Sequence, residues 1–119
     1  MKLFLVLSVC LISFGFLNAQ SKHILTESDK IKFLLNELEK SDPNLKFIRN
    51  GEEFTGKDAR EHMQKKLDYA GKRIKTVNDF IDQIATKSYL TGNVYYVKLP
   101  NGGRVESAKW LRETLKKLN

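Results

Sequence analysis

The stretch that decides the fold is Phe47-Ile48-Arg49-Asn50-Gly51-Glu52-Glu53-Phe54, followed directly by Thr55-Gly56-Lys57-Asp58-Ala59-Arg60-Glu61-His62-Met63-Gln64-Lys65-Lys66-Leu67. Asn50-Gly51 lies between two short arms that carry apolar residues. This pattern predicts a β-hairpin, because a two-residue type I′ turn needs positive φ at both central positions. Thr55 can accept a hydrogen bond from a first helical turn, and Asp58 stands three residues later, as in a capping box. The stretch therefore predicts a hairpin that runs straight into a helix.

The first 19 residues predict export. Met1-Lys2 is a short basic start, residues 3–16 form an apolar run, and Ala19 is a small residue before a cleavage point. The run has the length of a secretory signal peptide and is too short for a comfortable transmembrane helix, and an uncleaved anchor is the alternative. We expect cleavage before Gln20, which leaves residues 20–119 as a single small exported domain, periplasmic or secreted, without a membrane span.

Composition narrows the range of partners. Cys10 is the one cysteine and falls in the signal, so the mature chain would have neither a disulfide nor a thiolate. Loss of Lys2 leaves 20 Lys and Arg against 14 Asp and Glu, a net charge of about +6. The basic residues are spread along the chain without an aromatic-interleaved motif, which argues against nucleic acid. An anionic cell-envelope component or a small anionic ligand is the expected partner, and a solvated basic surface without a partner is the alternative.

Three further helices are predicted from capping residues followed by apolar residues at helical spacing. They begin after Thr26, after Thr76 and at a cap formed by Ser107; the first should end near Lys40 and the second near Lys87.

The best strand signal is the β-branched and aromatic segment 94–99, which turns through 100–103 and pairs back with 104–106. Four helices packed with a small antiparallel element of two short hairpins make an α+β domain. The expected core is Leu34, Leu38, Met63, Leu67, Phe80, Ile84, Val97 and Leu111.

About half of the mature chain resembles a known family. The matching pieces are Phe47-Ile48-Arg49-Asn50-Gly51, Ala59, His62-Met63, Lys66-Leu67, Phe80-Ile81-Asp82, Ala85, Ser88, Thr91-Gly92 and Tyr95. In these residues the chain resembles the bacterial YfeK-like family of small periplasmic proteins of unknown function. Family members often carry a serine run before the Thr-Gly pair, where this chain has Lys87-Ser88-Tyr89. The resemblance implies export and a shared fold, and it brings no activity.

One ligand site is predicted from the positions of polar residues. The hairpin should deliver Arg49 against the second helix, where His62 and Lys66 lie one turn apart on the same flank. These donors suit a carboxylate or phosphate. The opposing wall would come from Ser88, Thr91 and Tyr95. Alternatively, Arg49 braces the hairpin by pairing with acids such as Glu52 or Glu53.

Two functions remain open at this stage. The first is a non-enzymatic binding or structural module of the cell envelope. The second is a small hydrolase in which His62 acts as base for the hydroxyl of Ser88 or Thr91. The sequence has no Gly-x-Ser-x-Gly turn and no His-x-x-x-His pair. We therefore expect neither a metal nor another cofactor.

Overall fold

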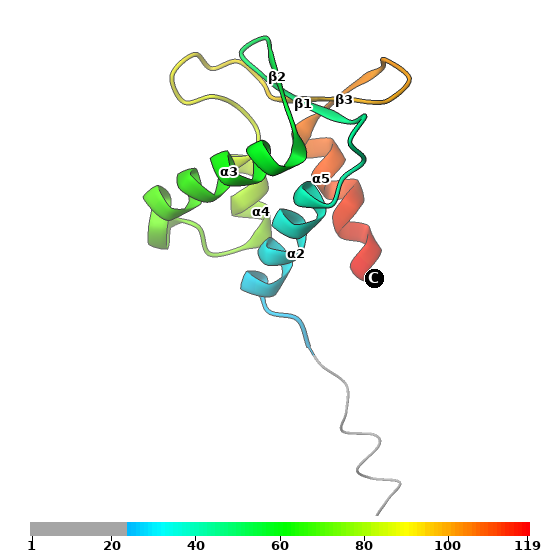
Figure 1. Ribbon diagram of the computed structural model, residues 1–119. Coiled ribbons are helices and arrows are strands. Elements are labelled where there is room, and N and C mark those ends of the chain that lie inside the picture. The colour runs from blue at the N-terminus through cyan, green and yellow to red at the C-terminus, as the bar shows by residue number, and fades with distance from the viewer. Residues whose placement is uncertain (1–23) are drawn as a thin grey trace, which may run out of the picture.

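The computed structural model describes residues 24–119 and confirms the α+β class (Figure 1). The expected signal peptide and the cleavage point before Gln20 lie outside this range. The helical elements are α2 (Glu27–Glu39), α3 (Gly56–Ala70), the 3₁₀ turn η1 (Gly71–Arg73), α4 (Val77–Asp79), the π-helix η2 (Phe80–Ile84), α5 (Ser107–Leu115) and the 3₁₀ turn η3 (Lys116–Leu118). None of the helices in this part of the chain is long and apolar enough to cross a membrane.

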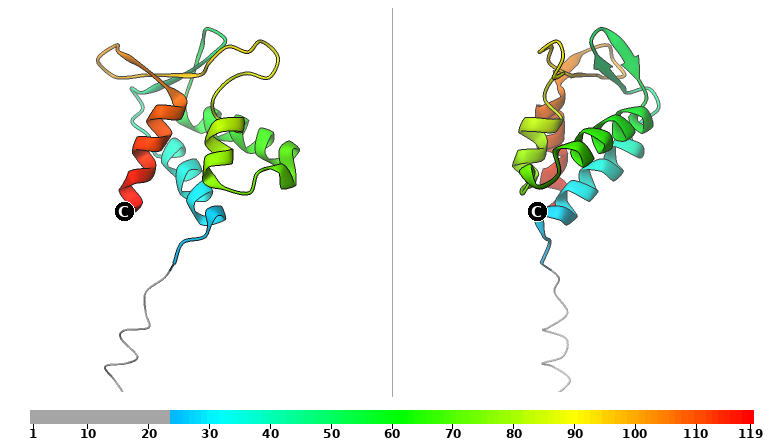
Figure 2. Two further views of the ribbon diagram at one scale, coloured as in Figure 1. Left: turned by 180° about the vertical axis from the view of Figure 1, so that it is seen from behind. Right: turned by 90° about the vertical axis from the view of Figure 1, so that its left-hand side faces the viewer.

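The strands form one antiparallel sheet at one end of the helices (Figures 1 and 2). Strands β1 (Lys46–Arg49), β2 (Glu52–Phe54), β3 (Tyr96–Lys98) and β4 (Arg104–Glu106) are ordered β2-β1-β3-β4. The two predicted hairpins therefore join edge to edge through β1 and β3. The strand expected over 94–99 is shorter than predicted, and Val94 forms only an isolated bridge to Lys87.

The first hairpin has the predicted turn. Arg49 pairs with Glu52, so Asn50 and Gly51 alone make the connection. Their φ values are 52° and 82°, both positive as a type I′ turn requires. Turn chemistry encoded in two adjacent residues therefore fixes the register of β1 against β2.

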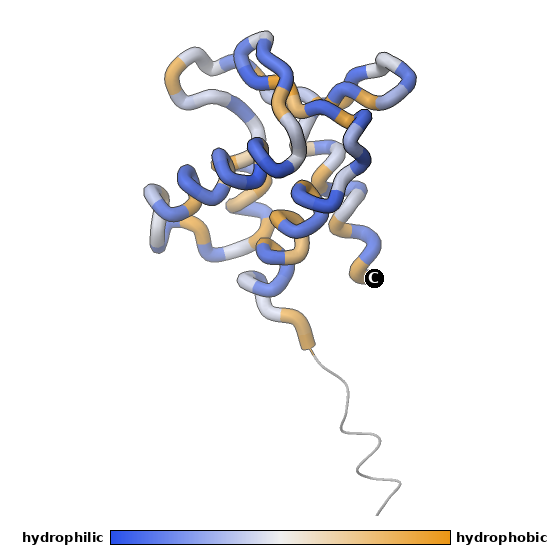
Figure 3. Tube along the Cα trace, in the orientation of Figure 1, coloured by the Kyte–Doolittle hydropathy of each residue, from blue (hydrophilic) through white to orange (hydrophobic). Residues whose placement is uncertain are grey.

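The core lies between the sheet and the helices, and α2 packs against α3, α4 and α5. Seven of the eight predicted core residues are buried, and Leu67 is partly buried against them. Along the tube in Figure 3, hydrophobic residues recur within the helices, whereas the hairpin turns are mostly hydrophilic. The amphipathic pattern of each helix thus places its apolar face against the others.

Threonine caps begin three of the four helices, as predicted. Thr26 and Thr76 form full capping boxes with Asp29 and Asp79, and Thr55 accepts from the amide of Asp58. The predicted Ser107 cap is wrong, because Glu106 occupies the N-cap position and Ser107 is the first helical residue. The Ser107 amide donates to the Tyr95 carbonyl, so the β3–β4 hairpin sets where α5 begins.

The third helix differs from its prediction in both length and geometry. It begins after Thr76 but changes to a π-helix at Phe80 and ends at Ile84, three residues before the predicted end at Lys87. The amide of Ala85 donates to the Phe80 carbonyl, five residues back. One extra residue in this turn shifts the direction of every carbonyl that follows it.

Candidate functional site

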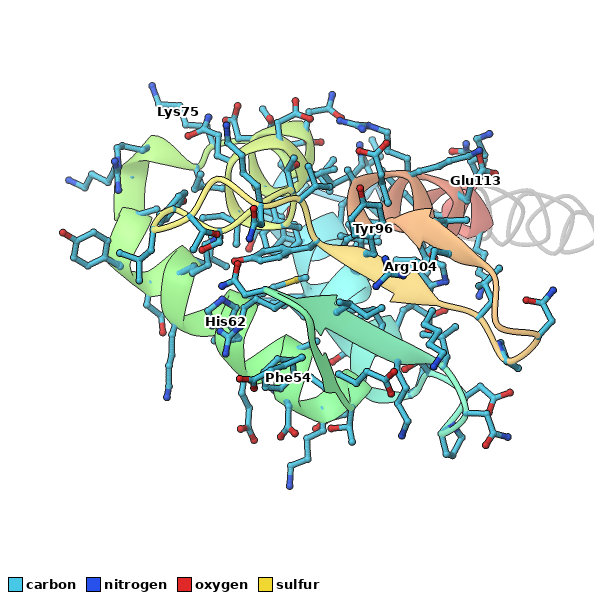
Figure 4. All side chains as sticks on the ribbon, turned by 90° about the horizontal axis from the view of Figure 1, so that it is seen from above. Phe54, His62, Lys75, Tyr96, Arg104 and Glu113 are labelled. Atoms are coloured by element: carbon cyan, nitrogen blue, oxygen red, sulfur yellow. The ribbon has the colours of Figure 1, made fainter. Side chains whose placement is uncertain are left out.

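The predicted site residues come from three elements that meet beside the first hairpin. An open cleft of about 360 Å³ is lined by Arg49, Asn50, Glu52, Phe54, His62, Lys66, Ser88, Tyr89, Leu90 and Tyr95. Figure 4 looks down on the sheet and shows His62 on α3 beside the β1–β2 hairpin, with Phe54 close to it. Five of the six predicted residues therefore line one cleft, and Thr91 does not.

Arg49, His62 and Tyr95 form a continuous chain of polar contacts. Arg49 Nη1 lies 2.5 Å from His62 Nδ1 and 2.9 Å from His62 Nε2, and His62 Nε2 lies 3.2 Å from the Tyr95 hydroxyl. Because a guanidinium can only donate, the nearer nitrogen, Nδ1, accepts from Arg49. The Nε2–H of the neutral ring then donates to the Tyr95 oxygen.

Lys66 lies deeper than the other cations, with 9% of its surface exposed. Its ammonium donates to the carbonyl of Ile84 at 2.7 Å, the carbonyl of Lys87 at 3.0 Å and the hydroxyl of Tyr95 at 3.1 Å. Ile84 is the last residue of η2, where helix carbonyls lack helical partners and the dipole favours a cation. Lys66 thus caps another helix, and its three donors are already used.

Some hydrogen-bond donors of Arg49 and Tyr95 are not used within residues 24–119 and remain for a ligand. With the imidazole proton assigned to Nε2, the Tyr95 oxygen accepts from both His62 and Lys66, so its own O–H is left to donate elsewhere. Arg49 uses one amino group on His62 and stacks its guanidinium 4.7 Å from the centre of the Phe54 ring. Its other N–H groups and the Tyr95 hydroxyl are the donors of this chain of contacts that remain for a ligand.

Burial and mutual repulsion lower the pKa of both bases in the cleft. Burial, followed by the charges of Arg49, Lys66 and Lys65, lowers the pKa of His62 from 6.5 to about 4. Burial and the charge of Arg49 lower the pKa of Lys66 from 10.5 to about 8. At neutral pH the cluster therefore holds a neutral imidazole between two cations.

The charge of this cluster is not balanced by an acid. Among residues 24–119, neither Arg49 nor Lys66 forms an ion pair or hydrogen bond with a carboxylate. Glu52 lines the cleft without pairing to Arg49, and Glu53 pairs with Lys98 at 3.0 Å instead. The expected alternative, a hairpin brace between Arg49 and Glu52 or Glu53, does not occur.

Ser88 and Thr91 have different places. Ser88 is buried in the wall of the cleft and its hydroxyl accepts from the Thr91 amide at 3.4 Å. The exposed Thr91 hydroxyl donates to Asn50 Oδ1 at 2.7 Å, and Asn93 Nδ2 donates to the same oxygen at 3.2 Å. Thr91 therefore ties the loop before β3 to the turn of the first hairpin.

The hydrolase arrangement is not assembled within residues 24–119. His62 contacts Arg49 and Tyr95, and it makes no hydrogen bond to Ser88 or Thr91. Its pKa of about 4 also makes it a weak base at neutral pH. The same residues contain no group of three or more His, Cys, Asp or Glu that could hold a metal ion.

Two aromatic residues of the cleft were not predicted from the sequence. Phe54 stacks against Arg49, and the ring of Tyr89 lies 4.1 Å from the Lys66 ammonium. An arginine and an aromatic residue on paired strands is a signal that could have suggested the first contact. The second depends on how the chain leaves η2, which no local pattern reveals.

Comparisons with known proteins agree with the resemblance seen in the sequence. The chain is 40% identical over 69 residues to the uncharacterized protein YfeK of Salmonella typhimurium strain LT2, across 58% of this chain and 57% of that protein. The match thus spans a little over half the length of that relative. No solved structure matches the chain. Residues 25–119 match a family of unknown function, DUF5329, and the chain belongs to that family.

Proposed function

We propose that this protein is an exported, non-enzymatic module that binds small anions in the cleft between the first hairpin and α3. The observation that carries the proposal is the pair of cations, Arg49 and Lys66, in an open cleft without a carboxylate partner in the described chain. Buried charges are normally paired, and a ligand carboxylate or phosphate would supply the missing partner.

The two cations have different roles in this proposal. Arg49 presents a planar fork of N–H donors, which fits two oxygens of a carboxylate or phosphate. The Tyr95 hydroxyl adds a third donor. Lys66 is held by the carbonyls of Ile84 and Lys87, so it contributes its charge rather than a direct hydrogen bond. Each charge-assisted hydrogen bond to the ligand would contribute about 1.5 to 3 kcal/mol.

Residues 1–19 of the sequence support the exported compartment in this proposal. A short basic start, an apolar run and a small residue at position 19 are typical of a secretory signal. The ligand would then be an anionic component of the cell envelope or a small anion that passes through it. The mass of the protein recovered from its native host tests this part, with an amino terminus at Gln20 as the expected result and a retained 3–16 run as the contrary one.

Titration calorimetry with inorganic phosphate at low salt tests the site. Arg49→Met should weaken binding tenfold or more, because about 1.4 kcal/mol of lost interaction is a factor of ten. The matched control is Arg104→Met. Arg104 lies on β4 with its guanidinium 5.3 Å from the centre of the Tyr96 ring, so it is also stacked on an aromatic residue, but it does not line the cleft.

The two variants separate a site from a general effect of positive charge. Each removes one positive charge and one cation–π contact from the sheet. Equal loss of phosphate affinity in both would show non-specific attraction to a basic surface, and the proposal would then fail. A melting temperature that collapses in Arg49→Met with unchanged phosphate affinity would make Arg49 a structural residue only.

A further inference from the structure

A second pocket adjoins the cleft. It has a volume of about 240 Å³, it is open to solvent, and it lies between β1 and α3. Arg49, Phe54, His62 and Tyr95 line both cavities. A molecule held by Arg49 and Tyr95 therefore has immediate access to this second space.

The inner wall of this pocket is apolar except for Ser107, which is also buried and lines it. Phe47 and Ile48 from β1 and Ala59 and Met63 from α3 are all buried and all line it. A closed apolar cavity of about 150 Å³ can hold a benzene molecule. The pocket beside Arg49 therefore has room for an aromatic ring or a short aliphatic chain.

The rim of the pocket on α3 carries two carboxylates and one lysine ammonium. Asp58 and Glu61 line it at the surface of α3, together with Lys65. Two carboxylates near the pocket would repel a second negative charge on the far end of a ligand. A ligand with one anionic group and an apolar body matches both cavities at once.

We infer that the ligand is a small amphipathic monoanion, with its carboxylate at Arg49 and Tyr95 and its apolar group between β1 and α3. This inference rests on the proposed function and names the ligand class. It makes Phe47, Ile48, Ala59 and Met63 determinants of specificity, because they would contact the apolar group alone. Arg49 would contact the anionic group whatever body is attached to it.

A chain-length series tests the inference on the full exported domain. Acetate, butyrate and hexanoate are titrated by calorimetry, with hexanol and the dicarboxylate adipate as controls. Affinity should rise by about fourfold for each methylene that enters the pocket, the equivalent of about 0.8 kcal/mol. Hexanol should bind far more weakly than hexanoate because it lacks the charge, and adipate should bind more weakly because its second carboxylate would meet Asp58 and Glu61.

Two variants on α3 locate the apolar group. Ala59→Leu narrows the pocket and should remove the preference for hexanoate over acetate. Ala70→Leu is the matched control, since Ala70 is also buried on α3 but lines neither cavity. If Ala59→Leu does not fold, the wild-type protein still gives an answer: the methyl NMR signals of Ala59 and Met63 should shift with hexanoate and not with acetate.

The outcomes separate this inference from the function beneath it. If no anion in the series binds the wild-type domain, the proposed function fails and the inference fails with it. If acetate and hexanoate bind equally, with both weakened by Arg49→Met, the anion site stands and the apolar pocket is refuted. If hexanol binds as tightly as hexanoate, the pocket does not act together with Arg49 and the inference is again overturned.

Discussion

The ammonium of Lys66 lies 3.1 Å from the hydroxyl of Tyr95 and joins the middle of α3 to the residue that leads into β3. Tyr95 is buried, and its ring lies 4.8 Å from the same ammonium. Through this contact the helix layer and the sheet share one polar group at the base of the cleft. The protonation state of Lys66 can therefore be followed by measuring the stability of the whole domain.

Stability should change with pH through Lys66. The pKa of this ammonium is about 8 in the folded protein and 10.5 in the unfolded chain, so the unfolded state holds more protons between these values. Below pH 8 the buried charge of Lys66 destabilises the folded state. This destabilisation is lost as the pH rises to 10.5. Relative to Lys66→Met, the wild-type protein should gain up to about 3 kcal/mol across that window.

Urea denaturation of both proteins at pH 7, 8.5 and 9.5 measures this effect. Taking the difference from Lys66→Met cancels the titration of the lysines and tyrosines that do not contact Lys66. A stability difference that stays constant over the whole range would show that Lys66 has an ordinary pKa and that its burial costs nothing.

His62 should report on the charge around it. Its pKa of about 4 is below the unfolded value, so the stability that it contributes is lost as the pH falls from about 6.5 through 4. Removing the repulsion from Arg49 in Arg49→Met should move the pKa of His62 upward. Bound phosphate should do the same in the wild-type protein. A proton NMR titration of the imidazole measures both shifts.

The distant Arg104→Met variant is the control for this titration, and it should leave the pKa of His62 where it was. An equal upward shift in both arginine variants would mean that the whole basic surface, rather than the neighbouring guanidinium, sets the pKa.

Gly56 should be intolerant of a side chain. A Cβ at this position would overlap the carbonyl oxygen of Leu38 and the hydroxyl of Ser41 at the end of α2. Gly56→Ala would therefore push α2 and α3 apart, and overpacking of this kind costs about 1–3 kcal/mol. Thermal denaturation checks it. Lys57→Ala, the exposed neighbouring residue, should change stability by less than about 0.5 kcal/mol.

Ser107 should be better replaced by alanine. Ser107 as a whole residue is 1% exposed, and its hydroxyl has no hydrogen-bond partner in residues 24–119. A buried polar group without a partner costs about 1–3 kcal/mol, so Ser107→Ala should raise the free energy of unfolding. Thr114→Val on the same helix is the contrast, because the Thr114 hydroxyl donates to the Trp110 carbonyl at 2.8 Å. Denaturation of both variants should give opposite signs; a loss in Ser107→Ala would reveal a partner for the hydroxyl.

The sequence predicts well those structural features that depend only on residues close together in the chain. Asn50-Gly51 sets the hairpin register, and Thr26, Thr55 and Thr76 set three helix starts, because turn and cap geometry depend on side chains a few positions away. The approach of Arg49 to His62 also follows from local order, since the hairpin leads directly into α3.

The rest of the site depends on contacts between distant segments. Lys66 resembles an ordinary solvent-facing helix residue in the sequence, and only the end of η2, some 20 residues later, supplies the carbonyls that bury it. The apolar pocket likewise depends on how β1 and α3 are placed relative to each other. The Ser107 prediction failed because the β3–β4 hairpin, rather than the serine hydroxyl, fixes the start of α5.

The amide of Ala85 donates to the carbonyl of Phe80, five residues back. The geometry of the cleft therefore depends on the number of residues in this turn as well as on their type. Deleting a single exposed residue of that turn, such as Gln83, would restore ordinary α-helical spacing and rotate the following segment by about 100° around the helix axis. The carbonyls of Ile84 and Lys87 would then turn away from Lys66. Relatives that lack this extra residue should therefore place something other than lysine at the position of Lys66, so that insertion and lysine would be gained or lost together.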